Sequence, residues 1–439
     1  MIPDTTRRDF IKSSTSILAA AQTLGPHRLF AAAPTRMLNL AVIGCGGIMG
    51  THVKGLAERK GEVTISWLCD VDPAQIERKA LMIPEGFQAS PPGKSLDYEE
   101  VLKDPDVDAC VIATPHHWHA RMAIAALQAG KHVYLEKPIS HVYAEGPLLA
   151  AAAQKYNRIL QQGSQMRSSP VTAKAGQLLR DGIIGDIKVA RAWTAETRSA
   201  VKPLPDSDPP PGVDYDRWLG PAPKRPFNPH RFHFSWRMFK DYGNGEIGDD
   251  GIHDLDMAAW GLGIDTLPKQ ITARGSRMLL DGHVSDYPDN MNVTYEYPDG
   301  KLLIYENYPF TEYGMHGFDN GNVFYGTKGY MIFSRRGAFS TFLGPKSTPG
   351  PTEGKELRGL KGYTEHMTNF LESVRNGTPV NAPPEIAHRS CALVHLGEIA
   401  FRTTGRLQFD PHHEKFTDHP AANELLSKFY RDPYPIPPL

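Results

Sequence analysis

Two positions four residues apart, Asp249 and His253, follow a glycine-rich stretch and lead into an apolar run that is typical of a helix. Four residues make about one helical turn, so the carboxylate lies on the same face as the imidazole and can orient it. An imidazole titrates near neutral pH and can therefore accept the proton of a substrate hydroxyl. Lys137, directly after the apolar segment 132–135 and Glu136, can donate a hydrogen bond to the same oxygen. Lys137, Asp249 and His253 are our predicted catalytic residues, suited to oxidising a carbinol.

The elements that must position these residues begin near residue 37, where the sequence pattern changes abruptly. The apolar segments in LNLAVIG, VTISWLC, DACVIAT and KHVYLEK alternate with segments of helical periodicity, such as 121–128. This alternation is typical of a doubly wound, parallel sheet with helices on both faces. The first half of the chain is therefore expected to be a Rossmann-type domain.

The first strand ends in a turn that contains Gly44, Gly46 and Gly47. Glycine lets the backbone of such a turn approach a pyrophosphate, and the amides of the helix that follows, which opens with Ile48 and Met49, favour the phosphate charge. The third glycine of the dinucleotide fingerprint falls on Met49, which puts the closeness of helix–strand packing in doubt more than the binding itself. We expect all five residues to contact a dinucleotide.

The second strand ends in Asp70, twenty positions after Gly50. An acidic side chain at this place accepts hydrogen bonds from the ribose 2′-hydroxyl and repels a 2′-phosphate. The three residues that follow, at 71–73, include no arginine that would hold that phosphate. NAD is therefore the predicted cofactor, with NADP less favoured.

Ligands of open parallel sheets collect at the carboxyl ends of the strands, and two later strand ends are rich in polar residues. The predicted cofactor contacts at these ends are Thr114, Pro115, His116, His119, Glu136 and Lys137. The predicted substrate contacts are Lys137, Trp118, Arg167, Trp236, Asp249 and His253. No cysteine or close carboxylate completes a shell around the histidines at 116–119, so we expect no metal site.

The second half of the chain has a different pattern. Alternating apolar and polar residues flank the turns at 298–300 and 327–329, which predicts antiparallel hairpins. Residues 344–355 are interpreted as an exposed loop. The Pro-rich and aromatic-rich segment 201–242 is too long for a simple connection, and a role over a cleft or in wrapping the sheet is expected.

Four motifs in order resemble the glucose–fructose oxidoreductase / inositol dehydrogenase (Gfo/Idh/MocA) family. They are the glycine turn at 44–50, Thr114-Pro115 followed by a histidine, the Glu-Lys-Pro at 136–138, and the Asp-x-x-x-His at 249–253. The resemblance implies an NAD-binding Rossmann domain at 34–160, followed by an α/β domain at 161–439 on a large open, mostly antiparallel sheet. It also implies a homo-oligomer, either a dimer or a tetramer. A helix near 386–403 is expected to pack back on the first domain.

The N-terminal TRRDFIK, followed by a short apolar stretch, resembles a twin-arginine export signal. We expect a signal peptide at 1–33 and a periplasmic or otherwise exported protein. The net charge of −1 gives no electrostatic basis for binding nucleic acid, and no apolar run is long enough for a membrane span. The four cysteines form no CxxC motif and are expected to be buried single thiols.

These observations favour an NAD-dependent oxidoreductase that acts on a hydroxyl of a sugar, glycoside or polyol. An exported enzyme has no ready supply of NAD, so we expect the cofactor to be held tightly and recycled in place. One alternative is a redox-neutral enzyme that cleaves or epimerises a glycoside through a transient keto sugar. Another is a non-catalytic binding protein that contains the cofactor.

Overall fold

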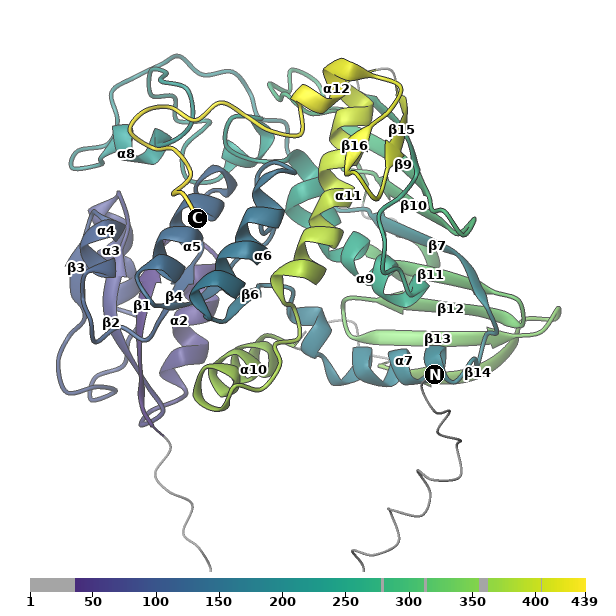
Figure 1. Cartoon of the computed structure of the whole chain (residues 1–439), viewed down its shortest axis with the longest axis horizontal. Coiled ribbons are helices and arrows are strands. Elements are labelled where there is room, and N and C mark those ends of the chain that lie inside the picture. Colours follow the sequence, from purple (N-terminus) through teal and green to yellow (C-terminus); the bar gives the residue numbers. More distant parts are fainter. Residues whose placement is uncertain (1–35, 278–279, 312–313, 355–361, 404) are drawn as a thin grey trace, which may run out of the picture. The chain divides into compact units, whose positions relative to one another are not determined.

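The computed structural model describes residues 36–277, 280–311, 314–354, 362–403 and 405–439. The predicted signal peptide at 1–33 lies outside the described residues. From Met37 to Leu439 the chain forms one compact unit that contains two sheets (Figure 1). Within the described ranges, no helix is both long and apolar enough to cross a bilayer.

The first sheet is entirely parallel, with strand order β3-β2-β1-β4-β5-β6, which is the Rossmann order. Its strands are β1 Leu38–Ile43, β2 Val63–Cys69, β3 Gly93–Ser95, β4 Ala109–Ile112, β5 His132–Leu135 and β6 Leu160–Gln162. The helices between them are α2 Met49–Ala57, α3 Pro73–Ala80, α4 Tyr98–Leu102, α5 His116–Gln128 and α6 Glu145–Tyr156. Strand β4 is buried at every position, because helices cover both faces of the sheet, and so its sequence is a continuous apolar run.

The second sheet has ten strands in the order β14-β13-β12-β11-β7-β10-β9-β8-β15-β16. The strands are β7 Ile187–Thr194, β8 Gln270–Ser276, β9 Asn290–Glu296, β10 Leu302–Asn307, β11 Asn320–Gly326, β12 Gly329–Ser334, β13 Ala338–Leu343, β14 Thr348–Glu353, β15 Arg406–Asp410 and β16 Lys415–Phe416. Its described strand pairs are antiparallel except β7 with β10, which confirms the predicted α/β class with a mostly antiparallel second sheet.

Both predicted hairpins are present, β9–β10 around residues 298–300 and β11–β12 around 327–329. The interpretation of 344–355 as a loop was wrong, because β14 at Thr348–Glu353 pairs with β13. Its sequence, TPGPTE, contains two prolines that cannot donate to a ladder, and it is tolerated only because β14 is an edge strand.

The remaining helices follow β6 in the chain. They are η1 Gln165–Ser168, α7 Pro170–Arg180, α8 Tyr215–Leu219, η2 Ser235–Met238, the π-helix η3 Ile247–Gly251, α9 Ile252–Leu262, η4 Met315–Gly317, α10 Tyr363–Asn376, α11 Pro384–Arg402 and α12 Pro420–Glu424. Helix α9 lies against β7 and β11 of the large sheet, and α11 contacts both α9 and α6. One helix layer therefore bridges the Rossmann sheet and the large sheet.

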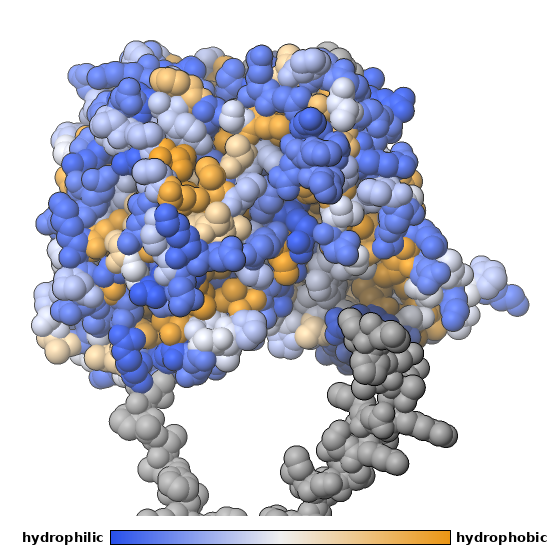
Figure 2. All heavy atoms as spheres, in the orientation of Figure 1, coloured by the Kyte–Doolittle hydropathy of each residue, from blue (hydrophilic) through white to orange (hydrophobic). Residues whose placement is uncertain are grey.

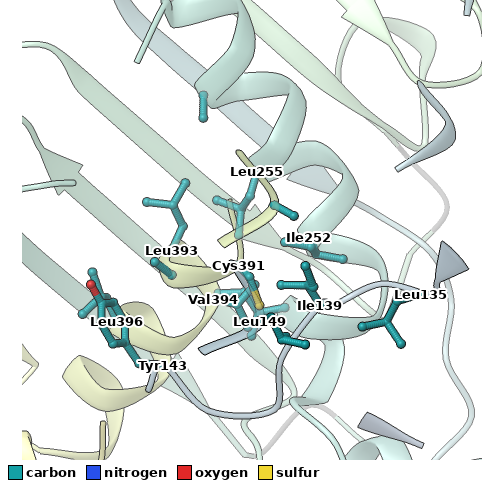
Figure 3. Packing of buried hydrophobic residues seen from close by; sticks show 14 of the residues in the cluster. Leu135, Ile139, Tyr143, Leu149, Ile252, Leu255, Cys391, Leu393, Val394 and Leu396 are labelled. Carbon is teal, nitrogen blue, oxygen red and sulfur yellow. The ribbon is translucent and has the colours of Figure 1, made fainter. Parts of the chain in front are cut away.

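A single buried cluster of hydrophobic residues runs between the two sheets (Figure 3). Leu135 and Ile139, on either side of the Glu-Lys-Pro motif, pack in it together with Ile252 of α9 and Val394 of α11. These side chains are at most 1% exposed, and each contributes about 1.5–3 kcal/mol when fully buried. The segment that carries Lys137 and the helix that carries His253 are thus held on one core. On the face drawn in Figure 2, hydrophilic residues predominate and hydrophobic residues show between them.

The packing of α9 against the large sheet can be tested at Gly261. A methyl group there would lie 2.3 Å from the ring of Phe324, so we expect Gly261→Ala to lower the free energy of unfolding by about 1–3 kcal/mol. Gly55 of α2 is the matched control, because a methyl group there meets nothing within 4 Å. Gly55→Ala should raise stability by up to about 1 kcal/mol through helix propensity. Denaturant titration measures both, and equal effects of the two substitutions would contradict this packing.

Candidate active site

A groove of about 410 Å³ lies where β1, β2 and β4 of the Rossmann sheet end. Of the predicted cofactor residues, Gly44, Gly46, Gly47, Ile48, Asp70, Thr114 and Pro115 line it. The structure therefore brings together the glycine turn and the ends of the neighbouring strands, as expected from the parallel order of the sheet.

The glycine turn is shaped to admit a ligand to the backbone. Gly44 has a φ of +86°, and a Cβ on it would lie 2.6 Å from the carbonyl oxygen of Ala113, so glycine is required there. A Cβ on Gly46 or Gly47 would meet nothing within 4 Å and would project into open space. Thr114 adds a buried hydroxyl without a hydrogen-bond partner among the described residues. An open glycine cradle and an unpaired hydroxyl fit a dinucleotide in this groove.

Met49 does not line the groove, although it was predicted to contact the cofactor. Met49 is the first residue of α2 and is fully buried in the hydrophobic core. An apolar side chain therefore packs at the position where the fingerprint has glycine for close helix–strand contact. At the next position, 50, a larger residue than glycine would fit, since a Cβ there would make ordinary contact with Met82 at 3.5 Å.

Asp70 projects from the end of β2 into the groove. Its carboxylate accepts hydrogen bonds from the backbone N–H of Cys45 at 2.6 Å and of Asp72 at 2.9 Å, which fix its orientation. Burial raises the pKa of Asp70 to about 6, and the two backbone donors limit the rise. The group is therefore a fixed acceptor at neutral pH, as contact with a ribose hydroxyl requires.

A second cavity of about 230 Å³ adjoins the groove, and Ile48, Ala113, Thr114, Trp236 and Arg237 line both. The second cavity is also lined by His116, Glu136, Lys137, Gln165, Asp249, Asp250, His253, Arg335 and Tyr363. All three predicted catalytic residues therefore face one space next to the predicted cofactor groove.

Lys137, which follows β5 of the Rossmann sheet, forms an ion pair with Asp249, which lies in η3. The Lys137 Nζ lies 3.0 Å from the Asp249 Oδ1 and also donates to the Asp249 carbonyl. Arg237 donates from Nε to the same Oδ1 at 3.0 Å. Burial alone would raise the pKa of Asp249, but the charges of Arg237 and Lys137 outweigh it and hold that pKa well below its usual range. Asp249 is thus a permanent carboxylate that orients the Lys137 ammonium.

His253 lies in α9, about one helical turn after Asp249. Asp249 lies in the π-helix η3, whose wider turn precedes α9, and such π turns occur often at functional sites. Burial lowers the pKa of His253 to about 3, and the nearby charges of Lys137 and Arg335 add to this effect. Within the described part of the chain no hydrogen bond to its ring is found, so a neutral imidazole with a free nitrogen lone pair faces the cavity.

Arg335 and Asp250 complete the opposite wall and were not predicted as site residues. Arg335, in the turn between β12 and β13, donates from Nη2 to the Asp250 Oδ1 at 3.1 Å and to the Glu196 Oε1 at 3.3 Å. Burial alone would raise the pKa of Asp250, but the charges of Arg335, Lys137 and Arg198 together outweigh it and hold that pKa below its usual range. No local signal marked Arg335, because it reaches the site only through the fold of the large sheet.

His116 and Glu136 line the second cavity rather than the groove in which they were predicted. The His116 Nδ1 lies 2.9 Å from the Oδ1 of Asn244, whose amide donates to the His141 carbonyl, so Nδ1 carries the proton and Nε2 is an acceptor. Glu136 lies 2.8 Å from His52 Nε2 on α2, which ties the Glu-Lys-Pro segment to the glycine-turn helix.

Three other predicted residues occupy different places from those expected. Trp118, predicted to contact substrate, lines the cofactor groove instead. His119 is fully buried, with its ring nitrogens 2.7 Å from the Pro138 carbonyl and 2.8 Å from the Thr114 carbonyl, so it joins the two strand ends rather than lining either cavity. Arg167 pairs with both carboxylate oxygens of Asp256 and does not line either cavity. Trp236 lines both cavities.

Family models account for most of the described chain. Residues 38–164 match the model described as "Oxidoreductase family, NAD-binding Rossmann fold", and residues 187–436 match "Oxidoreductase family, C-terminal alpha/beta domain". The chain belongs to the Gfo/Idh/MocA oxidoreductase family. Its Rossmann part is thereby an NAD-binding domain, and the groove described above lies at the carboxyl ends of the strands, where dinucleotides bind in this fold.

Several relatives of the chain are named for inositol or sugar chemistry. The chain is 24% identical over 352 residues to myo-inositol 2-dehydrogenase of Thermotoga maritima, which covers 78% of this chain and 90% of that one. It is 32% identical over 152 residues to a glycosyl hydrolase family 109 protein of Solibacter usitatus, covering 32% and 34% of the two chains. The fold resembles that of a levoglucosan dehydrogenase in complex with NADH and levoglucosan, with a TM-score of 0.65–0.66 in two structures of that enzyme, 20% identity in the complex, and coverage of 85% and 99%.

The pKa of Asp70 makes NAD binding depend on pH. Above about pH 6 its carboxylate is charged and available to accept the ribose hydroxyl, as predicted, and below that pH protonation removes this acceptor. We expect the dissociation constant for NAD to rise as the pH falls from 7 to 5, by at most about tenfold per pH unit. Asp70→Asn should bind NAD more weakly at pH 7 and lose this dependence. Calorimetric titration measures it, and an equal slope in the two proteins would assign the effect to another group.

Proposed function

We propose that this protein is an NAD-dependent oxidoreductase that acts on a CH–OH group of an uncharged sugar, glycoside or polyol. One observation carries the proposal: Lys137, Asp249 and His253 face a single cavity that adjoins the dinucleotide groove. A proton acceptor and a polarising donor thus stand beside the place where a hydride acceptor binds.

In the proposed mechanism the residues move one proton and hold one oxygen. Lys137, fixed by Asp249 at 3.0 Å, donates a hydrogen bond to the substrate oxygen and stabilises the negative charge that develops on it. His253 is neutral because burial lowers its pKa to about 3, and it takes the hydroxyl proton as departure of the hydride makes that hydroxyl strongly acidic. NAD, when bound, supplies the acceptor for the hydride that leaves the carbon bearing this hydroxyl. Reversal of these steps returns both the proton and the hydride.

The charge balance of the second cavity supports an uncharged substrate. Its cations are Lys137, Arg237 and Arg335, and its carboxylates are Glu136, Asp249 and Asp250. Each cation is already paired with a carboxylate of the wall at 3.0–3.1 Å. A sugar phosphate or uronate would need an unpaired cation, whereas hydroxyls can donate to and accept from the paired groups.

NAD is proposed over NADP because Asp70 is a charged acceptor at neutral pH and a 2′-phosphate would face it. The alternative of a redox-neutral enzyme uses the same steps: oxidation of one ring hydroxyl acidifies the neighbouring C–H, elimination or epimerisation follows, and the hydride returns. The match to glycosyl hydrolase family 109 proteins supports this alternative. A non-catalytic binding protein is disfavoured, since Lys137, Asp249 and His253 are all present and face one cavity.

The predicted twin-arginine leader gives the proposal a cellular setting. This export route carries folded proteins, so NAD would be loaded before export and then retained and recycled in place. We further propose a homo-oligomer, on the basis of the family resemblance.

Substitution of Lys137 tests the proposed function. Lys137→Ala removes the donor to the substrate oxygen, and we expect turnover of a responsive glycoside to fall at least about 100-fold while NAD content is unchanged. Lys224→Ala is the control, because this lysine is exposed and does not line either cavity. Product analysis by mass spectrometry, with absorbance at the NADH band, measures turnover and separates net dehydrogenation from redox-neutral chemistry. Undiminished activity of Lys137→Ala would overturn the assignment.

A further inference from the structure

The segment that follows α12 was not part of the predicted site, yet it reaches the cofactor groove. In Figure 1 it runs from α12 past α8 and ends beside α5. Pro433 and Tyr434 of this segment line the groove itself. The C-terminal strap, as we call residues 428–435, therefore forms a wall of the site that the Rossmann sheet alone leaves open.

A buried ion pair anchors the strap at its start. The Lys428 Nζ lies 2.9 Å from Glu145 of α6, whose side chain is only 1% exposed, and 2.8 Å from the His141 Nδ1. The hydroxyl of Tyr430 donates to the same carboxylate at 2.8 Å. Breaking one partner of a buried pair leaves an uncompensated charge, so this end of the strap is firmly fixed.

Arg431 ties the middle of the strap to α8, in the long segment 201–242. Its Nε donates to the Gly220 carbonyl at 2.8 Å and its Nη1 to the Asp216 Oδ1 at 2.9 Å. Its guanidinium also lies 5.1 Å from the ring centre of Tyr434. The strap and the long segment are thus one connected cover rather than two independent loops.

Tyr434 contacts α5 on the side of the groove toward β3 and α4. Its ring meets Trp118 edge to face at 5.3 Å and lies 5.7 Å from the Arg121 guanidinium, which also donates to the Pro435 carbonyl. Arg121 in turn donates to the Tyr98 hydroxyl at 3.1 Å on α4. The ring therefore lies on the Asp70 side of the groove, where the adenosine half of a dinucleotide binds in this fold.

The long segment closes the groove from its own side. Its His233 lies 2.9 Å from Asp72, just after β2, and its Arg217 lies 3.0 Å from Asp97, just before α4. Both contacts join the segment to the rim of the Rossmann sheet. A nucleotide in the groove is consequently covered by two segments that are distant from the glycine turn in sequence.

We propose that the C-terminal strap is a cofactor-retaining element and that Tyr434 is a nucleotide-contacting residue on the adenosine side of the groove. This inference rests on the proposed function, since it explains how the NAD is kept. Release of the nucleotide then requires the strap to lift, and its anchors at Glu145 and Asp216 oppose that movement.

The test is the rate at which purified, NAD-loaded protein releases its cofactor after dilution, followed by the loss of protein-bound nucleotide. Tyr434→Ala should release NAD about tenfold faster, since the contact between the aromatic ring and the nucleotide is lost. Tyr434→Phe keeps the ring and should release NAD at the rate of the unmodified protein. Phe429→Ala is the matched control, because Phe429 belongs to the same strap, is 76% exposed and does not line the groove.

A chain that ends at Asp432 is the second variant, and it should release NAD at least as fast as Tyr434→Ala. Thermal unfolding of the variants without NAD checks that they remain folded. Release by both at the unmodified rate would overturn the strap and leave the proposed function intact. Failure of the full chain to bind NAD at all would overturn the proposed function itself, and the strap with it.

Discussion

The ion pair between Lys137 and Asp249 is the contact on which the rest of the site depends. One partner stands at the end of a Rossmann strand and the other in the π turn before α9, with 3.0 Å between their charged atoms. The two side chains are only 16% and 19% exposed, so their attraction is much less screened than that of a surface pair. The pair holds only because Leu135, Ile139 and Ile252 fix both backbones in one core.

The charged groups of the site are paired, whereas its proton acceptor is not. Asp249 and Asp250 keep their charge because arginines face them, whereas His253 is neutral because it is buried beside cations. A neutral base next to fixed ion pairs is a preorganised environment for removing a hydroxyl proton. The cover formed by the long segment and the strap favours the same chemistry, since it limits exchange of both water and nucleotide.

Local sequence patterns predicted the parallel sheet, the glycine turn, Asp70 and the Asp-x-x-x-His pair, because each depends on neighbours within a few residues. Patterns failed where a contact is set by distant parts of the chain. Arg335 enters the site from the large sheet, and Tyr434 enters the groove from the end of the chain, with no local feature to mark either. Trp118 illustrates the same limit: its position after β4 was recognised, but which cavity it faces depends on the segments that cover α5.

The central claim, that a hydride passes from a carbinol carbon to a retained nucleotide, is tested most directly by isotope transfer. The NAD-loaded protein is incubated with a glycoside that carries deuterium on its ring carbinol carbons, then denatured, and the released cofactor is examined by mass spectrometry. The account predicts that cofactor from samples denatured during the first turnover is partly reduced and that this reduced fraction carries one deuterium; in a redox-neutral cycle the label then returns to the product. Product formation without any reduced, deuterated cofactor during the first turnover would contradict it.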